Sequence, residues 1–255
     1  MNLTEVRAVV TGGASGLGYA VAELLVSQGG RVSLFDIQDA PGNKAAQTLG
    51  SQCRFQHCDV SSESSIDSAM QAAATAMGGL NVVVNCAGVG TAGRILGRNG
   101  PIPVDQFTRT IQINLVGTFM CDRAAAVIMQ HNPPGPDGER GVLIHTSSVA
   151  AFEGQIGQAA YTATKAAVAA MTLPIARELA MFGIRCVAIA PGIFHTPMLA
   201  GMPAEVQDSL GKQIPFPSRL GKPSEFAALA AAIITNPMLN GTTIRLDGAI
   251  RMQPK

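Results

Sequence analysis

Three side chains in the second half of the chain could carry proton chemistry. Tyr161 and Lys165 stand four residues apart in a segment with a helical pattern, so both lie on one face of a helix. An ammonium about 5 Å from a phenol stabilises the phenolate by roughly 3 kcal/mol at an effective dielectric of about 20, which lowers the phenol pKa by about 2 units. Ser148 stands 13 residues before Tyr161, where its hydroxyl can hydrogen-bond the same substrate oxygen. The three residues predict a general acid–base site.

The same spacing of Tyr and Lys is also typical of a solvated helix face. Against this alternative, the chain has only two tyrosines, Tyr19 and Tyr161, and the second of them falls in this arrangement.

A glycine-rich turn near the N-terminus offers a phosphate site. Residues 11–18 read Thr-Gly-Gly-Ala-Ser-Gly-Leu-Gly between an apolar strand and a helical segment. Glycine permits positive φ and a close approach of a pyrophosphate, and the helix N-terminus supplies free N–H groups. A plain strand-to-helix turn is the alternative. The candidate contacts are Gly12, Ser15, Gly16, Leu17 and Gly18.

Asp36 ends the next apolar strand, 18 residues after Gly18. A carboxylate at about this distance accepts hydrogen bonds from the ribose hydroxyls of adenosine. It would repel a 2′-phosphate, and its neighbours Ile37 and Gln38 carry no cation to offset the repulsion. The position therefore predicts NAD rather than NADP as the cofactor. The alternative is that Asp36 caps the helix that follows.

Further candidate residues follow the third and fourth strands. Asp59 could accept from an adenine amino group while Val60 packs on the ring, and Cys86, Ala87 and Gly88 follow the next strand. Each of these residues, taken alone, could equally belong to an ordinary turn at a strand end.

Strands and helices alternate along the whole chain. The strands are predicted at residues 6–11, 31–36, 53–59, 80–85, 141–146, 185–189 and 242–246, and the helices at 17–28, 40–49, 62–77, 104–131, 158–181 and 223–235. This order predicts a single α/β domain over residues 1–255, with a doubly wound, Rossmann-type parallel sheet of about seven strands and helices on both faces. Such a sheet binds ligands at the carboxyl ends of its strands, where the candidate residues fall. Residues 191–221 are long and irregular, and their apolar side chains predict either a substrate lid or a loop packed on the core.

Composition excludes several classes of protein. Lys and Arg number 18 and Asp and Glu 17, so the net charge of +1 gives no general attraction for nucleic acid or an anionic membrane. The longest nearly unbroken apolar stretch, residues 226–234, has nine residues, whereas a membrane helix needs about twenty. Five cysteines without a CxxC pair predict free thiols in a reducing compartment. The four histidines lack ligand-type spacing, so no metal site is expected.

Together, these motifs resemble those of the short-chain dehydrogenase/reductase family. The glycine-rich turn is similar to that family's cofactor turn, and Ser148, Tyr161 and Lys165 match its catalytic set. Asn114 matches the fourth catalytic member, which in the family holds a water that links the lysine to solvent. The family usually has Asn-Asn-Ala-Gly after the fourth strand, and here Cys86 replaces the second Asn.

Longer stretches are similar to one branch of this family, the type II 3-hydroxyacyl-CoA dehydrogenases, also described as type 10 17β-hydroxysteroid dehydrogenases. They are residues 147–161, 214–221 and 246–254. The resemblance implies NAD-dependent oxidation of a secondary alcohol to a ketone, with short or branched 3-hydroxyacyl-CoA substrates and steroid alcohols as possible others. It also implies a homotetramer, through the Ala-rich helical segments, with the apolar tail 250–254 reaching a neighbour.

The resemblance also assigns contacts residue by residue. Ser15 and Leu17 would contact the pyrophosphate, and Asp36 the ribose. Tyr161 and Lys165 would reach the nicotinamide ribose, and Gln155, Ser148 and Tyr161 would face the substrate. The remaining implied cofactor contacts are Asp59, Val60 and Cys86 near adenosine and Pro191, Phe194 and Thr196 near the nicotinamide.

Alternative functions stay open at this point. They are a hydroxysteroid dehydrogenase, an NADPH-linked 3-oxoacyl reductase, and a non-catalytic NAD-binding scaffold in an RNA-processing complex. Asp36 disfavours NADPH, and the near-neutral charge disfavours a chain that binds RNA on its own. The expected location is the cytoplasm, or the mitochondrial matrix if the source is eukaryotic.

Overall fold

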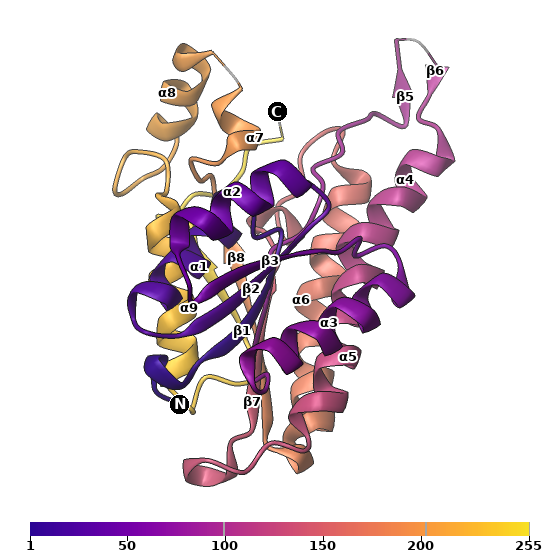
Figure 1. Cartoon of the computed structure of the whole chain (residues 1–255). Coiled ribbons are helices and arrows are strands. Elements are labelled where there is room, and N and C mark those ends of the chain that lie inside the picture. The colour runs from indigo at the N-terminus through magenta and orange to yellow at the C-terminus, as the bar shows by residue number, and fades with distance from the viewer. Residues whose placement is uncertain (99, 202, 255) are drawn as a thin grey trace.

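The computed structural model describes residues 1–98, 100–201 and 203–254, and one parallel sheet runs through it (Figure 1). The strand order is β3-β2-β1-β4-β7-β8-β9, and every neighbouring pair is parallel. The bounds are β1 Arg7–Thr11, β2 Arg31–Asp36, β3 Cys53–His57, β4 Val82–Asn85, β7 Gly141–Thr146, β8 Ile184–Pro191 and β9 Thr243–Leu246. The predicted doubly wound sheet of about seven strands is thus confirmed.

The central strands are apolar along their length because both faces of the sheet are covered. β1 pairs with β2 on one side and with β4 on the other, so that Val10 faces Leu34 and Val84 across the ladders. All three residues are fully buried. The strand order reverses between β1 and β4, and this reversal opens a crevice at the carboxyl ends of the two strands.

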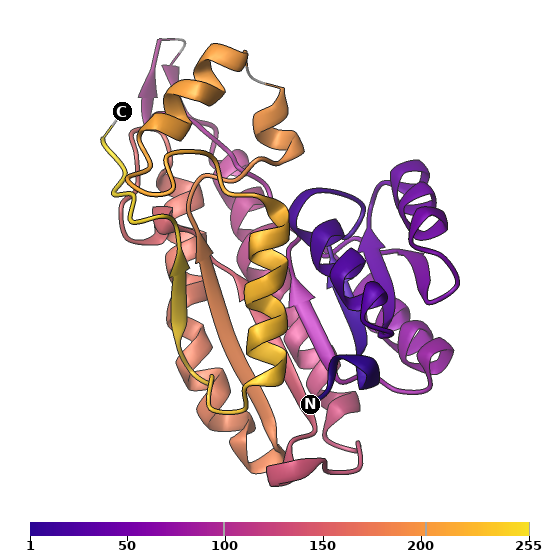
Figure 2. The ribbon, with the colours of Figure 1, turned by 90° about the vertical axis from the view of Figure 1, so that its left-hand side faces the viewer.

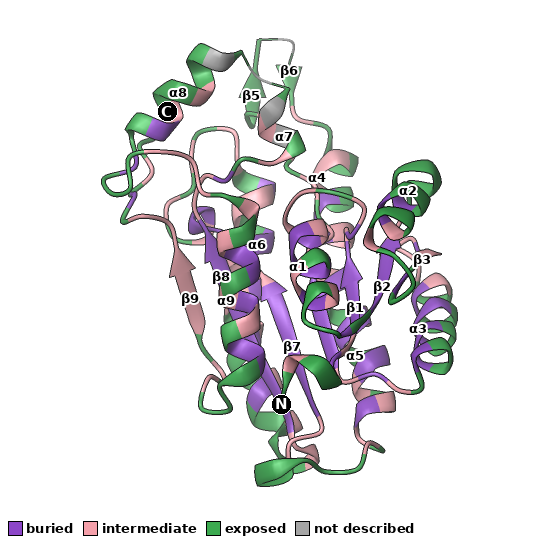
Figure 3. Cartoon of the chain, turned by 60° about the vertical axis from the view of Figure 1, so that its left-hand side comes forward, coloured by how far each residue is buried: buried purple, intermediate pink, exposed green. Residues whose placement is uncertain are grey.

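Two layers of helices cover the sheet (Figure 2). α1, α2 and α9 lie on one face and α3, α5 and α6 on the other, each layer closing one of two apolar cores. Figure 3 shows the helices buried on the side that faces the strands and exposed on the other. The bounds are α1 Gly16–Ser27, α2 Asp39–Leu49, α3 Glu63–Met77, α5 Gly117–Met129, α6 Ala159–Leu179 and α9 Pro223–Thr235.

The predicted helix over residues 104–131 is continuous but contains a π turn. It consists of α4 Val104–Ile111, the π turn Gln112–Val116 and α5. By length and composition alone, Val104–Met129 could cross a membrane, but 39% of its most apolar window is buried inside the protein. Cys121, Ala125 and Met129 are fully buried under the sheet, as in a core helix.

The sequence did not predict two features above the carboxyl ends of the strands. Residues 191–221 include two helices, α7 Pro197–Ala200 and α8 Ala204–Lys212, and β5 Leu96–Gly97 forms a hairpin with β6 Gly100–Pro101 (Figure 1). These elements are short and amid irregular chain, so they carry little periodicity. Met202, one of the apolar residues of the expected lid, lies outside the described residues.

Candidate active site

The glycine-rich turn fits tightly between the ends of β1 and β4. Gly12 and Gly16 have φ of +63° and +56°, which glycine adopts without strain. A Cβ on Gly12 would lie 2.9 Å from the Cα of Ala87, and a Cβ on Gly18 would lie 2.5 Å from the carbonyl oxygen of Gly12. The Thr11 hydroxyl accepts a hydrogen bond from the Ala87 N–H at 3.0 Å. Three of the predicted glycine positions therefore need glycine for conformation or space.

The start of α1 presents its N–H groups to this crevice. Ser15 is the N-cap, is exposed, and makes no side-chain hydrogen bond to the helix. The first N–H groups of a helix have no partner within the helix and can bind an anion. Gly16 and Leu17 follow at the first two helical positions, and a Cβ on Gly16 would lie 3.3 Å from the Pro197 side chain. These residues fit the pyrophosphate of a dinucleotide at the predicted place.

Asp36 lies at the edge of the same turn. Its carboxylate accepts hydrogen bonds from the Ala14 N–H at 3.2 Å and from the Gln38 N–H at 3.1 Å. The Gln38 contact belongs to the start of α2, so the capping role and the position beside the glycine-rich turn coexist. A carboxylate retains acceptor sites after two such bonds.

The other residues predicted at the adenosine side have partners within the protein. Asp59 accepts from the N–H and the hydroxyl of Ser61 at 2.9 and 2.7 Å, and these bonds lower the pKa of its carboxyl. Val60 is buried in the core, with its carbonyl 2.6 Å from where a Gly117 Cβ would lie. Burial raises the pKa of the Cys86 thiol to about 11, and its sulfur accepts a hydrogen bond from Thr146 at 3.5 Å. Cys86 is therefore a neutral thiol at neutral pH.

The structure brings the predicted catalytic residues together. Ser148 follows the end of β7 and caps a 3-10 turn, where its Oγ accepts from the Ala150 N–H at 3.1 Å. Tyr161 and Lys165 share one face of α6, with the lysine Nζ 5.7 Å from the centre of the tyrosine ring. Lys165 Nζ donates to the carbonyl of Thr146 at 2.7 Å and is 6% exposed. A phenol, a hydroxyl and an amine thus meet where β7 ends and α6 begins.

Lys165 does not lower the pKa of Tyr161 as their spacing led us to expect. Burial raises the pKa of Tyr161 above 10, and the hydrogen bond with Ser148 only partly offsets this effect. Burial also lowers the pKa of Lys165 to about 8. Removing either group from water disfavours its charged form.

Asn114 lies in the π turn between α4 and α5 and is buried. Its amide accepts from the Val89 N–H at 2.8 Å and donates to the Val89 carbonyl at 3.0 Å and to the Thr164 hydroxyl at 3.2 Å. A Cβ on Gly88 would lie 3.2 Å from Asn114 Oδ1 and 3.6 Å from Lys165 Nζ. Both polar atoms therefore border the space that the missing side chain of Gly88 leaves. The water-mediated path from Lys165 to solvent through Asn114 stays a prediction.

Three further predicted cofactor contacts follow β8. Pro191 ends the strand, and Phe194 is buried against Gly221, where a Cβ would lie 2.7 Å from the ring. Thr196 is the N-cap of α7 and lies beside Gly16, since a Gly16 Cβ would be 3.8 Å from its Cβ. The segment after β8 thus closes the crevice opposite the glycine-rich turn.

Gln155 makes its contacts with the C-terminal tail and with the start of α6. Its side chain donates to the carbonyl of Gln253 at 3.0 Å and accepts from the Gln158 amide at 3.2 Å. Each end of the amide makes one hydrogen bond within the protein, and the predicted contact of Gln155 with the substrate stays a prediction.

The sequence reading missed a buried ion pair behind the site. His145 in β7 and Asp122 in α5 are almost fully buried, with Nε2 and Oδ2 2.7 Å apart. Asn85 donates to the other carboxylate oxygen at 2.9 Å, and Thr172 contacts His145 Nδ1 at 3.0 Å. A histidine within the apolar run of a central strand was the available signal, because a buried imidazole needs a partner. In the described part of the chain, no three His, Cys, Asp or Glu side chains are grouped as metal ligands.

Comparisons with known proteins agree with this geometry. Residues 6–207 match the model of the family described as short chain dehydrogenase. The chain belongs to the short-chain dehydrogenase family. It is therefore an oxidoreductase with a nicotinamide cofactor.

Proteins similar over the whole length carry a more specific name. A protein of Drosophila melanogaster named 3-hydroxyacyl-CoA dehydrogenase type-2 is 53% identical, with 96% of this chain and 97% of the relative covered. The Homo sapiens protein of the same name is 51% identical, with 97% and 95% covered. A crystal structure of 3-hydroxyacyl-CoA dehydrogenase type-2 from Mycobacterium avium is 42% identical with a TM-score of 0.92, covering 97% of this chain and 96% of that one.

Proposed function

We propose that this protein is an NAD-dependent dehydrogenase that oxidises the secondary alcohol of a short or branched 3-hydroxyacyl-CoA to a ketone. One observation carries the proposal. Ser148, Tyr161 and Lys165 meet at the carboxyl end of the sheet, beside the crevice that the glycine-rich turn opens. The full-length relatives named 3-hydroxyacyl-CoA dehydrogenase type-2 supply the substrate class.

Asp36 supports NAD over NADP. Its carboxylate lies within hydrogen-bond distance of the Ala14 N–H and so borders the glycine-rich turn directly. A 2′-phosphate in this position would face a negative charge, and the adjacent Ile37 and Gln38 offer no cation.

The side chains of the site have different roles in the transfer of the proton. A nicotinamide cofactor held at the glycine-rich turn would supply the hydride acceptor, and its oxidised ring would add a positive charge to the site. Tyr161 exchanges the proton of the substrate oxygen, and Ser148 holds the same oxygen by a hydrogen bond. Lys165 is fixed by the Thr146 carbonyl below the phenol, and Asn114 lies beside it at Gly88. Because burial raises the pKa of Tyr161, the phenol is protonated at neutral pH and must lose its proton before it can accept one from an alcohol.

The phosphates of a CoA ester need cations, and the candidates in the sequence are Arg94, Arg98, Lys212 and Arg219. Arg219 is engaged by Glu225 through two hydrogen bonds of 3.0 and 2.6 Å. Both Arg94, which precedes β5, and Arg98, which follows it, are exposed. The β5–β6 hairpin lies above the carboxyl ends of the strands of the large sheet (Figure 1). We propose these two arginines as the first to test for contact with CoA phosphates.

A homotetramer and a reducing compartment belong to the same proposal. α5 and α6 border an open apolar groove, and Phe119 and Val127 beside it are 52% and 59% exposed. A second copy would cover this apolar surface.

All five cysteines are free thiols, which supports the cytoplasm, or the mitochondrial matrix for a eukaryotic source. We place the reaction in the breakdown of fatty acids and isoleucine. The near-neutral net charge of the chain supports a small-molecule substrate, with no binding to nucleic acid or a membrane.

A substrate and cofactor panel tests the proposal. Initial rates of NADH formation would be compared for 2-methyl-3-hydroxybutyryl-CoA, the free 3-hydroxy acid and a 17β-hydroxysteroid, each with NAD and with NADP. We expect the CoA ester with NAD to be oxidised fastest. Turnover of the steroid alone would assign a hydroxysteroid dehydrogenase, and a preference for NADP would assign a reductase of the 3-oxoacyl type. Binding of NAD without turnover of any alcohol, together with an RNA mobility shift, would favour the scaffold.

A further inference from the structure

The chain between Ser148 and Tyr161 decides how these two residues are spaced. Its residues 152–158, called here the linking segment, form turns and bends outside the helices and strands. Because both catalytic side chains must meet one substrate oxygen, a small displacement of this segment changes the geometry of the site. Both side chains also hydrogen-bond that oxygen in the bound substrate, so the same displacement weakens the binding of the substrate.

The C-terminal tail, residues 247–254, lies along the linking segment. The Ile156 N–H donates to the carbonyl of Pro254 at 3.0 Å, and the Gln155 side chain donates to the carbonyl of Gln253 at 3.0 Å. Ile250 anchors the tail in the core and is 2% exposed. The tail thus packs on its own chain, and the expected contact with a neighbouring subunit stays a prediction.

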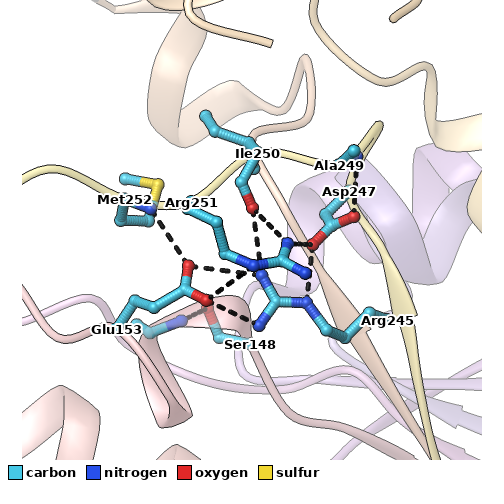
Figure 4. A network of polar contacts seen from close by, with 9 residues as sticks. Ser148, Glu153, Arg245, Asp247, Ala249, Ile250, Arg251 and Met252 are labelled. Atoms are coloured by element: carbon cyan, nitrogen blue, oxygen red, sulfur yellow. Dashed lines mark hydrogen bonds and ion pairs between the residues drawn. The ribbon is translucent and has the colours of Figure 1, made fainter. Parts of the chain in front are cut away.

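A network of charges fastens the tail to the linking segment (Figure 4). The Arg245 guanidinium at the end of β9 binds both carboxylate oxygens of Glu153, at 2.9 and 3.2 Å. It also donates to Asp247 at 2.7 Å. Glu153 accepts in turn from the Met252 N–H at 3.0 Å, and Arg251 lies 3.4 Å from both carboxylates. Glu153 is therefore held by the strand and by the tail at once.

The network is more than an exposed ion pair. The side chains of Arg245 and Glu153 are only 25% and 21% exposed, and the guanidinium lies over the Phe152 ring at 5.5 Å. Burial alone would raise the pKa of Glu153, but the bonds from Arg245 and Met252 hold it below its ordinary value. A two-point arginine–carboxylate contact fixes orientation as well as distance.

The tail is also shaped to hold this position. Asp247 accepts from the Ala249 N–H at 3.0 Å, and Ala249 keeps a φ of +68°, which a residue with a side chain rarely adopts. The Phe216 N–H donates to the Gly248 carbonyl at 3.3 Å. The turn therefore also contacts the chain that leads from α8, on the other border of the site.

We propose that Glu153 and Arg245 are positioning residues for the dehydrogenase reaction, and that the tail acts through them. Together they fix the linking segment and so determine how tightly the hydroxyacyl substrate binds. This inference rests on the proposed function for its substrate. The Glu153–Arg245 pair touches neither the glycine-rich turn nor Asp36, so it should leave binding of the nicotinamide cofactor unchanged.

The test uses two independent variants, Arg245→Gln and a chain that ends at Arg251. We expect each to raise KM for 3-hydroxybutyryl-CoA by about tenfold, the effect of 1.4 kcal/mol. The dissociation constant of NADH, measured by fluorescence, should stay within about twofold of the wild-type value, a change of less than 0.5 kcal/mol. Hydrogen exchange in residues 152–158 should accelerate in both variants. The effects of Glu153→Gln and Arg245→Gln on KM should be non-additive, because the two residues act as one pair.

Glu139→Gln is the matched control. Glu139 binds Arg185 at 2.7 Å before β7 begins, at the opposite end of the sheet, and the two side chains are only 9% and 8% exposed. The Glu139→Gln variant should be less stable than the wild-type protein, with no change in KM or in the rate of hydrogen exchange in residues 152–158. Unchanged KM in both test variants would overturn the inference, as would equal changes in Glu139→Gln. If the wild-type protein oxidises no hydroxyacyl-CoA, the proposed function fails, while the exchange data still decide whether the tail fixes the linking segment.

Discussion

The buried Asp122–His145 pair allows a quantitative prediction of stability. The two side chains are 4% and 0% exposed and 2.7 Å apart, and Asp122 also accepts from Asn85. Removing one partner of a buried pair costs about 3–5 kcal/mol, because it leaves the other without its counter-charge. In Asp122→Asn the imidazole can become neutral and keep a hydrogen bond to the amide, so we expect the lower end, about 3 kcal/mol. At about 2–4 °C per kcal/mol for a chain of this size, the melting temperature should fall by about 6–12 °C.

The pH dependence provides a second test of the same pair. Burial alone would lower the pKa of His145, but the Asp122 carboxylate raises it well above the ordinary 6.5. In the wild-type protein this stabilisation is fully present below pH 6.5 and is lost as the pH rises through the raised pKa. The variant loses the counter-charge, so its stability falls on acidification below pH 6.5. The difference between the two proteins should therefore be largest near pH 5.5 and shrink toward pH 9.

Urea unfolding at one protein concentration measures this difference. Asp67→Asn is the control, because Asp67 of α3 pairs with Arg123 of α5 at 3.1 Å but is 50% exposed. An exposed pair of this kind contributes less than about 1 kcal/mol. If Asp122→Asn cost as little as the control, or if the difference did not vary with pH, His145 would be neutral and the account of the pair would be wrong.

Three other predictions follow from the site and the tail. Gly18→Ala should abolish binding of the nicotinamide cofactor, because its Cβ would lie 2.5 Å from the Gly12 carbonyl, and fluorescence titration with NADH measures the loss. The rate of alcohol oxidation should rise with pH between 7 and 9, because the raised pKa of Tyr161 makes its phenolate the scarce form, while that of ketone reduction should stay nearly constant, because the phenol remains protonated; an oxidation rate that stays flat would contradict this. Ala249→Gly should raise stability by about 0.5–1 kcal/mol, because it relieves a φ of +68°, and a lower urea midpoint would show that the strain is absent.

The sequence predicted the large elements well, because each combines a clear apolar pattern with a boundary signal. α3 begins after Ser62, whose hydroxyl accepts from the Ser65 N–H, and ends at Gly78 with a φ of +72°. The buried strands β4 and β7 are nearly continuous apolar runs. The π turn around Asn114 was not predicted. A π turn changes the backbone hydrogen bonds locally, and the apolar pattern of the surrounding helix continues through it.

The catalytic residues could be located from spacing, whereas their pKa values and partners could not. Tyr161 and Lys165 lie on one helical face, as their spacing requires, but the degree of burial that raises one pKa and lowers the other depends on the whole fold. Gln155 and Glu153 make their contacts with the tail about one hundred residues away in the chain, and no local pattern encodes a contact at that distance. Asp122 and His145 each interrupt an apolar pattern, and only the packing of α5 against β7 shows that they pair.

The most direct test of the account is a comparison of Tyr161→Phe with the wild-type protein, using NAD and 2-methyl-3-hydroxybutyryl-CoA. The substitution removes one hydroxyl from a partly buried side chain and leaves the glycine-rich turn and Asp36 untouched. We predict that the wild-type protein forms NADH from the CoA ester, and that the variant binds NADH normally while its kcat falls by about a hundredfold or more, the contribution of a general acid–base group. A variant that oxidises the ester at nearly the wild-type rate would contradict the central claim that Tyr161 exchanges the proton in this site.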